Sequence, residues 1–224
     1  MDIKEAIRSR HSVRAYTDQP IEGEILSQLQ QMIQECNEES GLHIQLLVNE
    51  PSAFTGMMAR YGKFENVKNY IALVADKQQD AEEKCGYYGE KIVLHAQQLG
   101  LNTCWVALSF SKGKAKSAIT INSGEKLMMV ISLGYGANQG VVHKNKPIEA
   151  ISRMQEMEPQ WFRQGMDAVL LSPTAMNQQK FYFEQTGNKV KATAGSGFHT
   201  KVDLGIAKYH FEVGAGEADW EWQK

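Results

Sequence analysis

The chain has 224 residues, of which 42% are hydrophobic and 22% are charged. This is the composition of one or two globular domains, and it excludes a disordered chain and a collagen-like repeat. Because 24 Lys and Arg residues face 26 Asp and Glu residues, the net charge is −2, and the chain lacks the basic excess that would hold a nucleic acid.

The sequence carries no signs of export or of a membrane location. Its three cysteines cannot all pair with one another, which suits a reducing compartment better than a disulfide framework. The first residues lack the apolar core of a signal peptide, and no stretch approaches the roughly 18 apolar residues of a membrane-spanning helix. We therefore expect a cytoplasmic protein that binds neither a nucleic acid nor a membrane.

Hydrophobic periodicity predicts helices and short strands that follow one another without strict alternation. In chain order, we expect helices over 3–8, 22–36, 80–99, 147–154, 159–170 and 203–209. We expect strands over 43–48, 70–75, 103–108 and 127–133, and a hairpin over 180–193. Because these elements lack the regular order of βαβ units, they favour a layered α+β fold over a doubly wound sheet. His210, just after the last predicted helix, is expected in a strand.

Two stretches of the chain share the order helix, loop, strand. The first covers residues 22–48 and the second covers residues 159–184. Two copies of one supersecondary unit would explain this order. Such units are also common in unrelated folds, so a true repeat and a coincidence both remain open.

Residues 8–14, Arg-Ser-Arg-His-Ser-Val-Arg, combine three arginines, a histidine and two hydroxyls within seven positions. Alternate side chains of an extended backbone share one face, so Arg10, Ser12 and Arg14 would point the same way. Two guanidinium groups and a hydroxyl on one face are suited to bind a phosphate. A solvent-exposed basic turn is the alternative interpretation.

A second polar segment, residues 172–179, reads Ser-Pro-Thr-Ala-Met-Asn-Gln-Gln. It lies between a predicted helix and a predicted strand, where loops often carry function. The amides of Asn177 and Gln179 can donate and accept hydrogen bonds, as the edge of a flat heteroaromatic ring requires. An ordinary turn built on Pro and Asn would explain the same residues.

The sequence does not contain the motifs of several other chemistries. Residues 134–140 are one position too long for the Gly-x-Gly-x-x-Gly motif of dinucleotide-binding folds, and they lead into a loop rather than a helix. There is no phosphate-binding P-loop and no nucleophile elbow. The six histidines and three cysteines lack the spacing of zinc ligands, so we predict no metal site.

Together, the two polar segments resemble the nitroreductase family of FMN-dependent oxidoreductases. Residues 10–14 resemble the family's phosphate motif, Arg-x-Ser-x-basic. Residues 172–179 resemble its Pro-Ser-x-x-Asn-x-Gln-Pro loop beside the flavin ring, with Lys180 in place of the last Pro. Residues 99–105 are similar to the Gly-Leu-Gly-x-x-Trp-like exit of its central helix, with Asn102 in place of the second Gly. Residues 144–149 resemble the basic, Pro-containing segment that closes on the phosphate.

The resemblance implies a nitroreductase-like α+β fold, FMN as cofactor and NAD(P)H as co-substrate. It also implies a small aromatic acceptor, such as a nitro compound or a quinone. Since the flavin would carry the redox chemistry, no catalytic side chain is predicted. The residues expected to contact FMN are Arg10, His11, Ser12, Arg14, Trp105, Val106, Ala107, Lys144, Lys146, Pro173, Thr174, Ala175, Asn177 and Gln179.

One departure from the family pattern changes the expected assembly. Family enzymes are usually homodimers, in which FMN contacts the phosphate motif of one subunit and the Pro-Ser loop of the other. Their loop follows the first long helix, whereas here that place holds residues 36–40, Cys-Asn-Glu-Glu-Ser, and the loop follows the second long helix. We therefore predict an intrachain pseudo-dimer, with a first module over 1–150, a second over 151–224 and one FMN between them. It would be monomeric or a weak homodimer.

Two other functional classes remain open. The chain could bind FMN for storage or sensing without turnover. It could also be a degenerate pseudo-enzyme that serves as an interaction scaffold.

Overall fold

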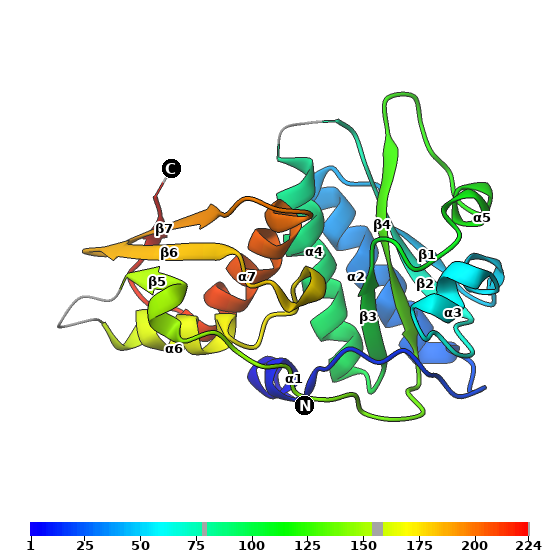
Figure 1. Cartoon of the computed structure of the whole chain (residues 1–224), viewed down its shortest axis with the longest axis horizontal. Coiled ribbons are helices and arrows are strands. Elements are labelled where there is room, and N and C mark those ends of the chain that lie inside the picture. The colour runs from blue at the N-terminus through cyan, green and yellow to red at the C-terminus, as the bar shows by residue number, and fades with distance from the viewer. Residues whose placement is uncertain (78–79, 154–158, 224) are drawn as a thin grey trace. The chain divides into compact units, whose positions relative to one another are not determined.

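The structure is a computed structural model that describes residues 1–77, 80–153 and 159–223 (Figure 1). The described residues form seven α-helices and two four-stranded sheets, so the predicted α+β class is confirmed. Contacts divide the chain into two compact units. Unit 1 consists of Met1, Ser9–Ala81 and Ile92–Val142. Unit 2 consists of Asp2–Arg8, Glu82–Lys91 and His143–Lys224.

Each unit is discontinuous in sequence. The helix α4 (Ala81–Gln98) contributes residues to both units. The division into modules at residue 150, which rests on the resemblance, stays a prediction.

The sheet of unit 1 is antiparallel throughout. Its strand order is β1 (Gln45–Leu47), β2 (Asn69–Ala75), β4 (Lys126–Gly134) and β3 (Asn102–Val106). All seven residues of β2 are buried, because the strand lies inside the sheet and both of its faces are covered. A strand buried on both faces is a continuous apolar run in the sequence, and this explains why it could be predicted.

Short helices cover one face of this sheet. Three of them, η1 (Ser52–Phe54), α3 (Met57–Tyr61) and α5 (Lys112–Ser117), contribute side chains to one hydrophobic cluster. The alternate residues Tyr70 and Ala72 of β2 belong to the same cluster, as the two-residue period of a strand requires. The long helix α2 (Gly23–Ser40) extends four residues beyond its predicted end and stops at Gly41, which adopts φ 72°.

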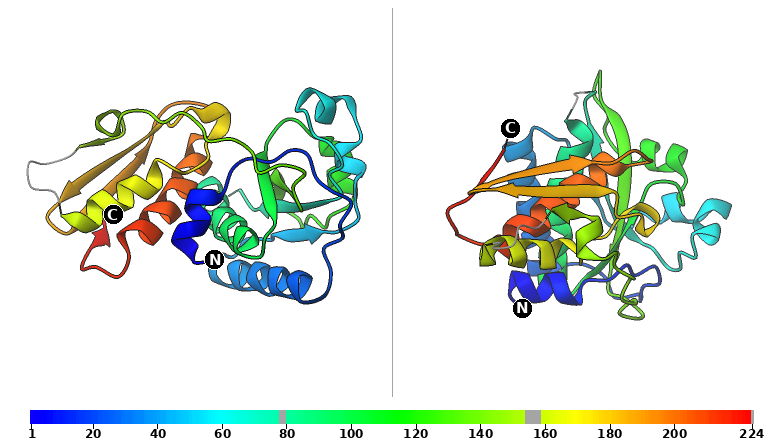
Figure 2. Two further views of the ribbon diagram at one scale, coloured as in Figure 1. Left: turned by 90° about the horizontal axis from the view of Figure 1, so that it is seen from below. Right: turned by 60° about the vertical axis from the view of Figure 1, so that its left-hand side comes forward.

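Unit 2 places two helices on one side of a hairpin. The hairpin strands β6 (Phe181–Thr186) and β7 (Lys189–Ala194) are antiparallel, and β5 (Ser152–Arg153) and β8 (Glu221–Trp222) add parallel edges. The helices α6 (Gln160–Val169) and α7 (Thr200–Ala215) lie on the same side of this hairpin (Figure 2). Aromatic side chains fill the space between, and they are Trp161, Phe162, Phe181, Phe183, Phe211, Trp220 and Trp222.

Glycines allow the helices of unit 2 to approach closely. A Cβ atom on Gly86 of α4 would overlap the carbonyl oxygen of Val202, and one on Gly205 of α7 would overlap that of Glu83. At the crossing of α6 and α7, a Cβ atom on Gly214 would lie 2.5 Å from the carbonyl oxygen of Gln164. These helices therefore meet backbone to backbone.

Two local predictions are wrong. The predicted helix 147–154 is a single 3-10 turn, Ile148–Ala150, followed by β5, whose Ser152 pairs with Phe183; residue 154 lies outside the described residues. His210 lies in α7 rather than in a strand, because that helix runs six residues past its predicted end at 209 to Ala215. None of the described helices is long and apolar enough to cross a membrane.

His210 belongs to a buried polar contact that joins three helices. Its side chain and that of Glu90 are fully buried, and its Nε2 lies 2.9 Å from Glu90 Oε1. Its Nδ1 lies 3.0 Å from the carbonyl oxygen of Ala168. Because a carbonyl oxygen only accepts, Nδ1 must carry a proton and donate it to Ala168. One contact thus links α4, α6 and α7.

Removing one member of this pair should destabilise the fold strongly. Glu90→Ala leaves the His210 imidazole buried with its main acceptor gone, and we expect a loss of about 3–5 kcal/mol in the free energy of unfolding. Denaturation by urea measures this loss. In the control Glu221→Gln, the exposed contact with Lys189 at 3.1 Å is weakened, and the loss should stay below about 1 kcal/mol. Equal losses in the two variants would contradict a stabilising role for the buried pair.

Candidate functional site

The arginine-rich segment runs as extended chain beside β3 in unit 1. Ser12 forms a parallel bridge with Thr103, and the Val13 amide donates to the Thr103 carbonyl oxygen at 3.0 Å. Val13 is fully buried in the core, whereas its neighbour Arg14 is exposed. Arg10 is only 3% exposed, so the two guanidinium groups differ sharply in their contact with solvent.

The predicted phosphate ligands converge on the thiol of Cys104 in β3, which is 2% exposed. Burial raises the pKa of this thiol. The charge of Arg14, a hydrogen bond with Ser12 and the charge of Arg10 act in the opposite direction. Ser12 is therefore in hydrogen-bonding contact with the thiol, and both arginines are near enough for their charges to act on it. We call residues 10–14 the cradle segment.

A buried tyrosine fixes the backbone of the cradle segment. The hydroxyl of Tyr16 donates to the Val13 carbonyl oxygen at 2.7 Å and lies 2.7 Å from Ser132 Oγ. Ser132 Oγ in turn lies 3.4 Å from the carbonyl oxygen of Cys104. Burial raises the pKa of Tyr16 well above its usual range, so the hydroxyl keeps its proton. Sequence reasoning missed the contact of this tyrosine with Ser132, because the two residues lie 116 positions apart.

The loop after β4 packs against the same segment. Asn102 accepts a hydrogen bond from the Gly136 amide at 3.1 Å and donates to Gln139 Oε1 at 3.2 Å. This asparagine stands where the resemblance expects a glycine, and here its side chain orders the loop. Gly140 of the loop adopts φ 72° and approaches His11 and Ser12.

The second predicted segment, residues 173–179, lies in unit 2, and we call it the amide loop. Three of its residues have left-handed backbone conformations, namely Met176 with φ 51°, Asn177 with φ 53° and Gln179 with φ 43°. Each such residue costs roughly 1–3 kcal/mol and persists only where the surroundings impose it. The conformation of this loop therefore requires strong restraints.

Gln179 supplies one of these restraints. It is 4% exposed, its Oε1 accepts from the Lys146 amide at 2.8 Å, and its Nε2 donates to the Lys144 carbonyl oxygen at 2.8 Å. The same Nε2 donates to Asn177 Oδ1 at 2.8 Å. With these partners, Gln179 acts as a brace between the amide loop and the basic segment 143–146.

Three other predicted contacts, Asn177 of the amide loop and Lys144 and Lys146 of the basic segment, are exposed at the surface. Asn177 is exposed and donates to the Lys144 carbonyl oxygen at 2.8 Å. Lys146 Nζ donates to the Gln179 carbonyl oxygen at 3.0 Å. The Lys144 ammonium makes no hydrogen bond or ion pair with any residue that the structure describes, so it is the better candidate to meet an anion.

Asp203 in the first turn of α7 supplies a second restraint that the sequence did not reveal. Its Oδ1 accepts from the Ala175 amide at 2.9 Å, and its Oδ2 accepts from Gln178 Nε2 at 2.7 Å. Asp203 is 2% exposed, and burial raises the pKa of its carboxyl group to about 6. A buried carboxylate thus holds two points of the amide loop.

The predicted residues fall into two sets, one in each unit. Residues 10–14 and 105–107 belong to unit 1, and residues 144–146 and 173–179 belong to unit 2. Within residues 105–107, the Val106 side chain lies in the hydrophobic core, while Trp105 and Ala107 are half-buried. The described residues contain no group of three or more His, Cys, Asp or Glu side chains that could hold a metal ion.

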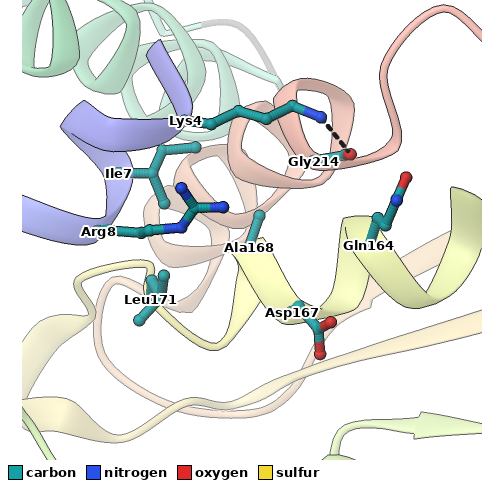
Figure 3. A pocket seen from close by; sticks show the side chains of 8 residues that line it. All are labelled: Lys4, Ile7, Arg8, Gln164, Asp167, Ala168, Leu171 and Gly214. Atoms are coloured by element: carbon teal, nitrogen blue, oxygen red, sulfur yellow. Dashed lines mark hydrogen bonds between the residues drawn. The ribbon is translucent and has the colours of Figure 1, made fainter. Parts of the chain in front are cut away.

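A hollow of about 180 Å³ lies elsewhere in unit 2 (Figure 3). Its lining residues are Lys4, Ile7, Arg8, Gln164, Asp167, Ala168, Leu171 and Gly214. Lys4 Nζ already donates to the Gly214 carbonyl oxygen at 3.4 Å, where the last turn of α7 leaves carbonyls without helical partners. Asp167 faces Arg163 at 3.9 Å. The hollow contains no predicted flavin contact, and we assign it no part of the candidate site.

The approach of Gly140 to the cradle segment can be tested with a matched pair of variants. A Cβ atom on Gly140 would lie 2.7 Å from His11 Cβ and 2.9 Å from the Ser12 carbonyl oxygen, whereas one on Gly124, with φ 90°, would meet nothing within 4 Å. Both Ala variants carry the left-handed strain, and only Gly140→Ala adds overpacking. We expect it to lower the free energy of unfolding by about 1–3 kcal/mol more than Gly124→Ala does. Equal free energies of unfolding for the two variants in urea denaturation would show that the loop does not pack closely against the cradle segment.

Comparison with known proteins identifies the family. A family model described as "Putative TM nitroreductase" matches residues 2–215. A solved "putative nitroreductase" from Thermotoga maritima has a TM-score of 0.67 and 22% identity, over 94% of this chain and 82% of that chain. No curated protein matches the sequence.

Two further solved structures are similar over shorter stretches. A "putative nitroreductase in complex with fmn" from Desulfovibrio desulfuricans has a TM-score of 0.52 and 19% identity, over 71% of this chain and 99% of that chain. The NfrA1 nitroreductase of B. subtilis has a TM-score of 0.56 and 13% identity, over 70% and 74%. These structures show the nitroreductase fold. Since the family model spans nearly the whole sequence, the chain belongs to the nitroreductase family that this model describes.

Proposed function

We propose that the chain is an FMN-binding oxidoreductase of the nitroreductase type. It would take reducing equivalents from NAD(P)H and pass them to a small aromatic acceptor, such as a nitro compound or a quinone. The observation that carries this proposal is the extended path of the cradle segment beside β3, from which Arg14, Ser12 and Arg10 all act on the Cys104 thiol. Family membership supports an oxidoreductase, and a similar fold from Desulfovibrio desulfuricans was solved in complex with FMN.

The cradle segment suits the phosphate of FMN. Guanidinium groups and hydroxyls form charge-assisted hydrogen bonds with phosphate oxygens, and a partly buried site screens these bonds less than water does. The Tyr16 hydroxyl holds the Val13 carbonyl, so the backbone that carries Ser12 and Arg14 is ordered before a ligand binds. Gly140 lets the neighbouring loop approach His11 without a side chain in between. Lys144 would add a further cation.

The amide loop suits the flavin ring. Asn177 presents a side-chain amide at the surface, and the half-buried Pro173, Thr174 and Ala175 present backbone groups. Gln179 would act through the loop as a brace, because its amide already bonds to Lys144, Lys146 and Asn177.

Trp105 to Ala107 would contact the ring from β3. The side chains of Trp105 and Ala107 are half-buried and within reach of a ligand, whereas Val106 would contribute only its backbone, because its side chain lies in the core.

When bound, FMN would supply the redox chemistry between NAD(P)H and the acceptor. The residues of the chain bind and orient the cofactor and set the charge around it. No side chain of the candidate site has to act as an acid or a base, since solvent can deliver the protons.

Because bound FMN is coloured, the purified protein should be yellow, and NAD(P)H should bleach the colour. A yellow protein that resists bleaching would bind flavin without turnover, and a colourless one that cannot be loaded with FMN would be a scaffold.

Removing both arginines of the cradle segment should strip the cofactor. Each charge-assisted contact is worth roughly 1.5–3 kcal/mol, so Arg10→Ala with Arg14→Ala should weaken FMN binding by a factor of about 10² to 10⁴. Fluorescence titration with FMN measures the affinity. Arg14→Ala alone keeps the buried Arg10 and separates lost binding from lost folding. Arg60→Ala, on the surface of α3, is the control and should bind FMN normally. Full flavin in the double variant would disprove the phosphate assignment.

The pseudo-dimer arrangement, in which both residue sets serve the same FMN, is likewise a proposal. Residues 36–40 lack the Pro-Ser pattern, and no second Arg-x-Ser-x-Arg follows residue 150, so the chain carries one copy of each motif. We expect one FMN per chain, in a monomer or a weak homodimer. Flavin extracted from a weighed amount of protein gives this ratio, with the oligomeric state determined on the same sample. Two FMN per chain would overturn the single-site proposal.

A further inference from the structure

We propose that Asp203 is a positioning residue for the amide loop, holding it in the binding conformation when ionised and releasing it when protonated. The proposal rests on the proposed function in one respect only, namely that this loop contacts FMN. The restraint itself is a property of the chain without a ligand. No sequence motif indicates this restraint, and Asp203 is not among the residues that the family resemblance implied.

The geometry makes Asp203 the point where three segments meet. From the first turn of α7, its carboxylate accepts the Ala175 amide at 2.9 Å and Gln178 Nε2 at 2.7 Å. Gln178 Nε2 also donates to the Phe198 carbonyl oxygen at 2.8 Å. The loop between Ala175 and Gln178 contains Met176 and Asn177, two of the left-handed residues. Asp203 thus bonds to both ends of the strained stretch.

Ionisation decides whether both bonds can exist. A carboxylate offers acceptors on both oxygens, and both are used here. A carboxylic acid carries a proton on one oxygen, which then faces an N–H donor. If the proton sits on Oδ2, the Gln178 amide must rotate to accept it, and Phe198 then loses its donor. If it sits on Oδ1, the Ala175 amide is left without its acceptor. Protonation therefore removes at least one restraint.

The surroundings place this titration in an accessible pH range. Burial raises the pKa of Asp203 to about 6, and the hydrogen bonds from Ala175 and Gln178 offset only part of that effect. The charged groups nearby, Lys144 and Lys146 beside the loop and Glu83 on α4, are not among its causes. His199 and Lys201 on its own element are not among them either.

The same titration has opposite effects on the whole fold and on the loop. Because the pKa is raised from 3.8, the folded chain binds the proton more tightly than the unfolded chain does. Protonation of Asp203 therefore stabilises the folded chain relative to the unfolded chain. This contribution to the free energy of unfolding is complete below about pH 4 and is lost as the pH rises through about 6. The amide loop behaves in the reverse way, since its restraints are complete only above that range. A general acid loosening of the protein would instead weaken both together.

The first experiment follows the loop in the full chain without FMN. In ¹⁵N-labelled protein, the Ala175 amide and the Gln178 side-chain amide should shift together with a common midpoint near pH 6. Asp203→Asn should abolish this titration. Asp167→Asn, which removes an exposed carboxylate on α6, should leave it unchanged. If the two signals do not titrate between pH 4 and 8, or titrate equally in Asp203→Asn, the proposal is wrong. The titration of the wild type tests the proposal even if the variant does not fold.

The second experiment links the loop to cofactor affinity. If only the ionised form binds well, the competent fraction falls about tenfold between pH 7 and pH 5. The phosphate of FMN titrates in the same range and affects every variant alike. The test therefore compares the ratio of the FMN affinity at pH 7 to that at pH 5 between the wild type and Asp203→Asn. The loss of FMN affinity from pH 7 to pH 5 should be about ten times larger in the wild type than in Asp203→Asn. Asp167→Asn should match the wild type.

The two experiments separate the inference from the proposed function. Equal affinity ratios in the wild type and Asp203→Asn would overturn the role of Asp203 in binding. Absence of any FMN binding, with the amide titration intact, would overturn the proposed function and leave Asp203 as the restraint of the loop. Absence of the amide titration, with normal FMN binding, would overturn the inference alone.

Discussion

The pairing of an extended segment with β3 is the constraint on which the cradle depends. Val13 turns into the core, and the bond from its amide to Thr103 fixes the strand-like path that directs its neighbours outward. The Tyr16 hydroxyl then donates a hydrogen bond to the Val13 carbonyl oxygen and so holds the backbone of the same segment. A short basic stretch that would otherwise be a flexible turn becomes a fixed array of donors, because one apolar residue is anchored in the sheet.

The second polar set obtains its order in a different way. The amide loop pairs with no strand among the residues that the structure describes, and three of its residues adopt strained backbone angles. Side chains compensate for this, with Gln179 bracing one side and the Asp203 carboxylate the other. Order that comes from a sheet is difficult to remove, whereas order that comes from a few side-chain hydrogen bonds can be changed by one proton. Unit 1 thus contains the rigid set and unit 2 the adjustable one.

Local patterns predicted much of the fold and part of the candidate site. The strand β2 could be predicted because it is a continuous apolar run, and the hairpin of Phe181 and Phe183 because its burial repeats with the period of a strand. The common face of Arg10, Ser12 and Arg14 was predicted only on the assumption of an extended backbone. The contact of Tyr16 with Ser132 and the bonds of Asp203 to the amide loop could not be predicted, since the partners lie 116 positions apart in the first case and 28 and 25 in the second. The C-terminal extent of α7 was missed because Gly214, which its packing against α6 requires, is a poor helix former.

The glycines at the helix contacts of unit 2 have a consequence for anyone who modifies the protein. Within an exposed helix, replacing glycine by alanine ordinarily gains roughly 1 kcal/mol, because alanine restricts the unfolded chain and favours helical angles. At Gly86 and Gly205 the methyl group would instead occupy the space of a backbone carbonyl of the facing helix. A carbonyl cannot turn aside as a side chain can, so the helices would have to separate along their length. A rule for thermostabilisation that scores each helix separately would therefore select Gly86 and Gly205, where the substitution is destabilising.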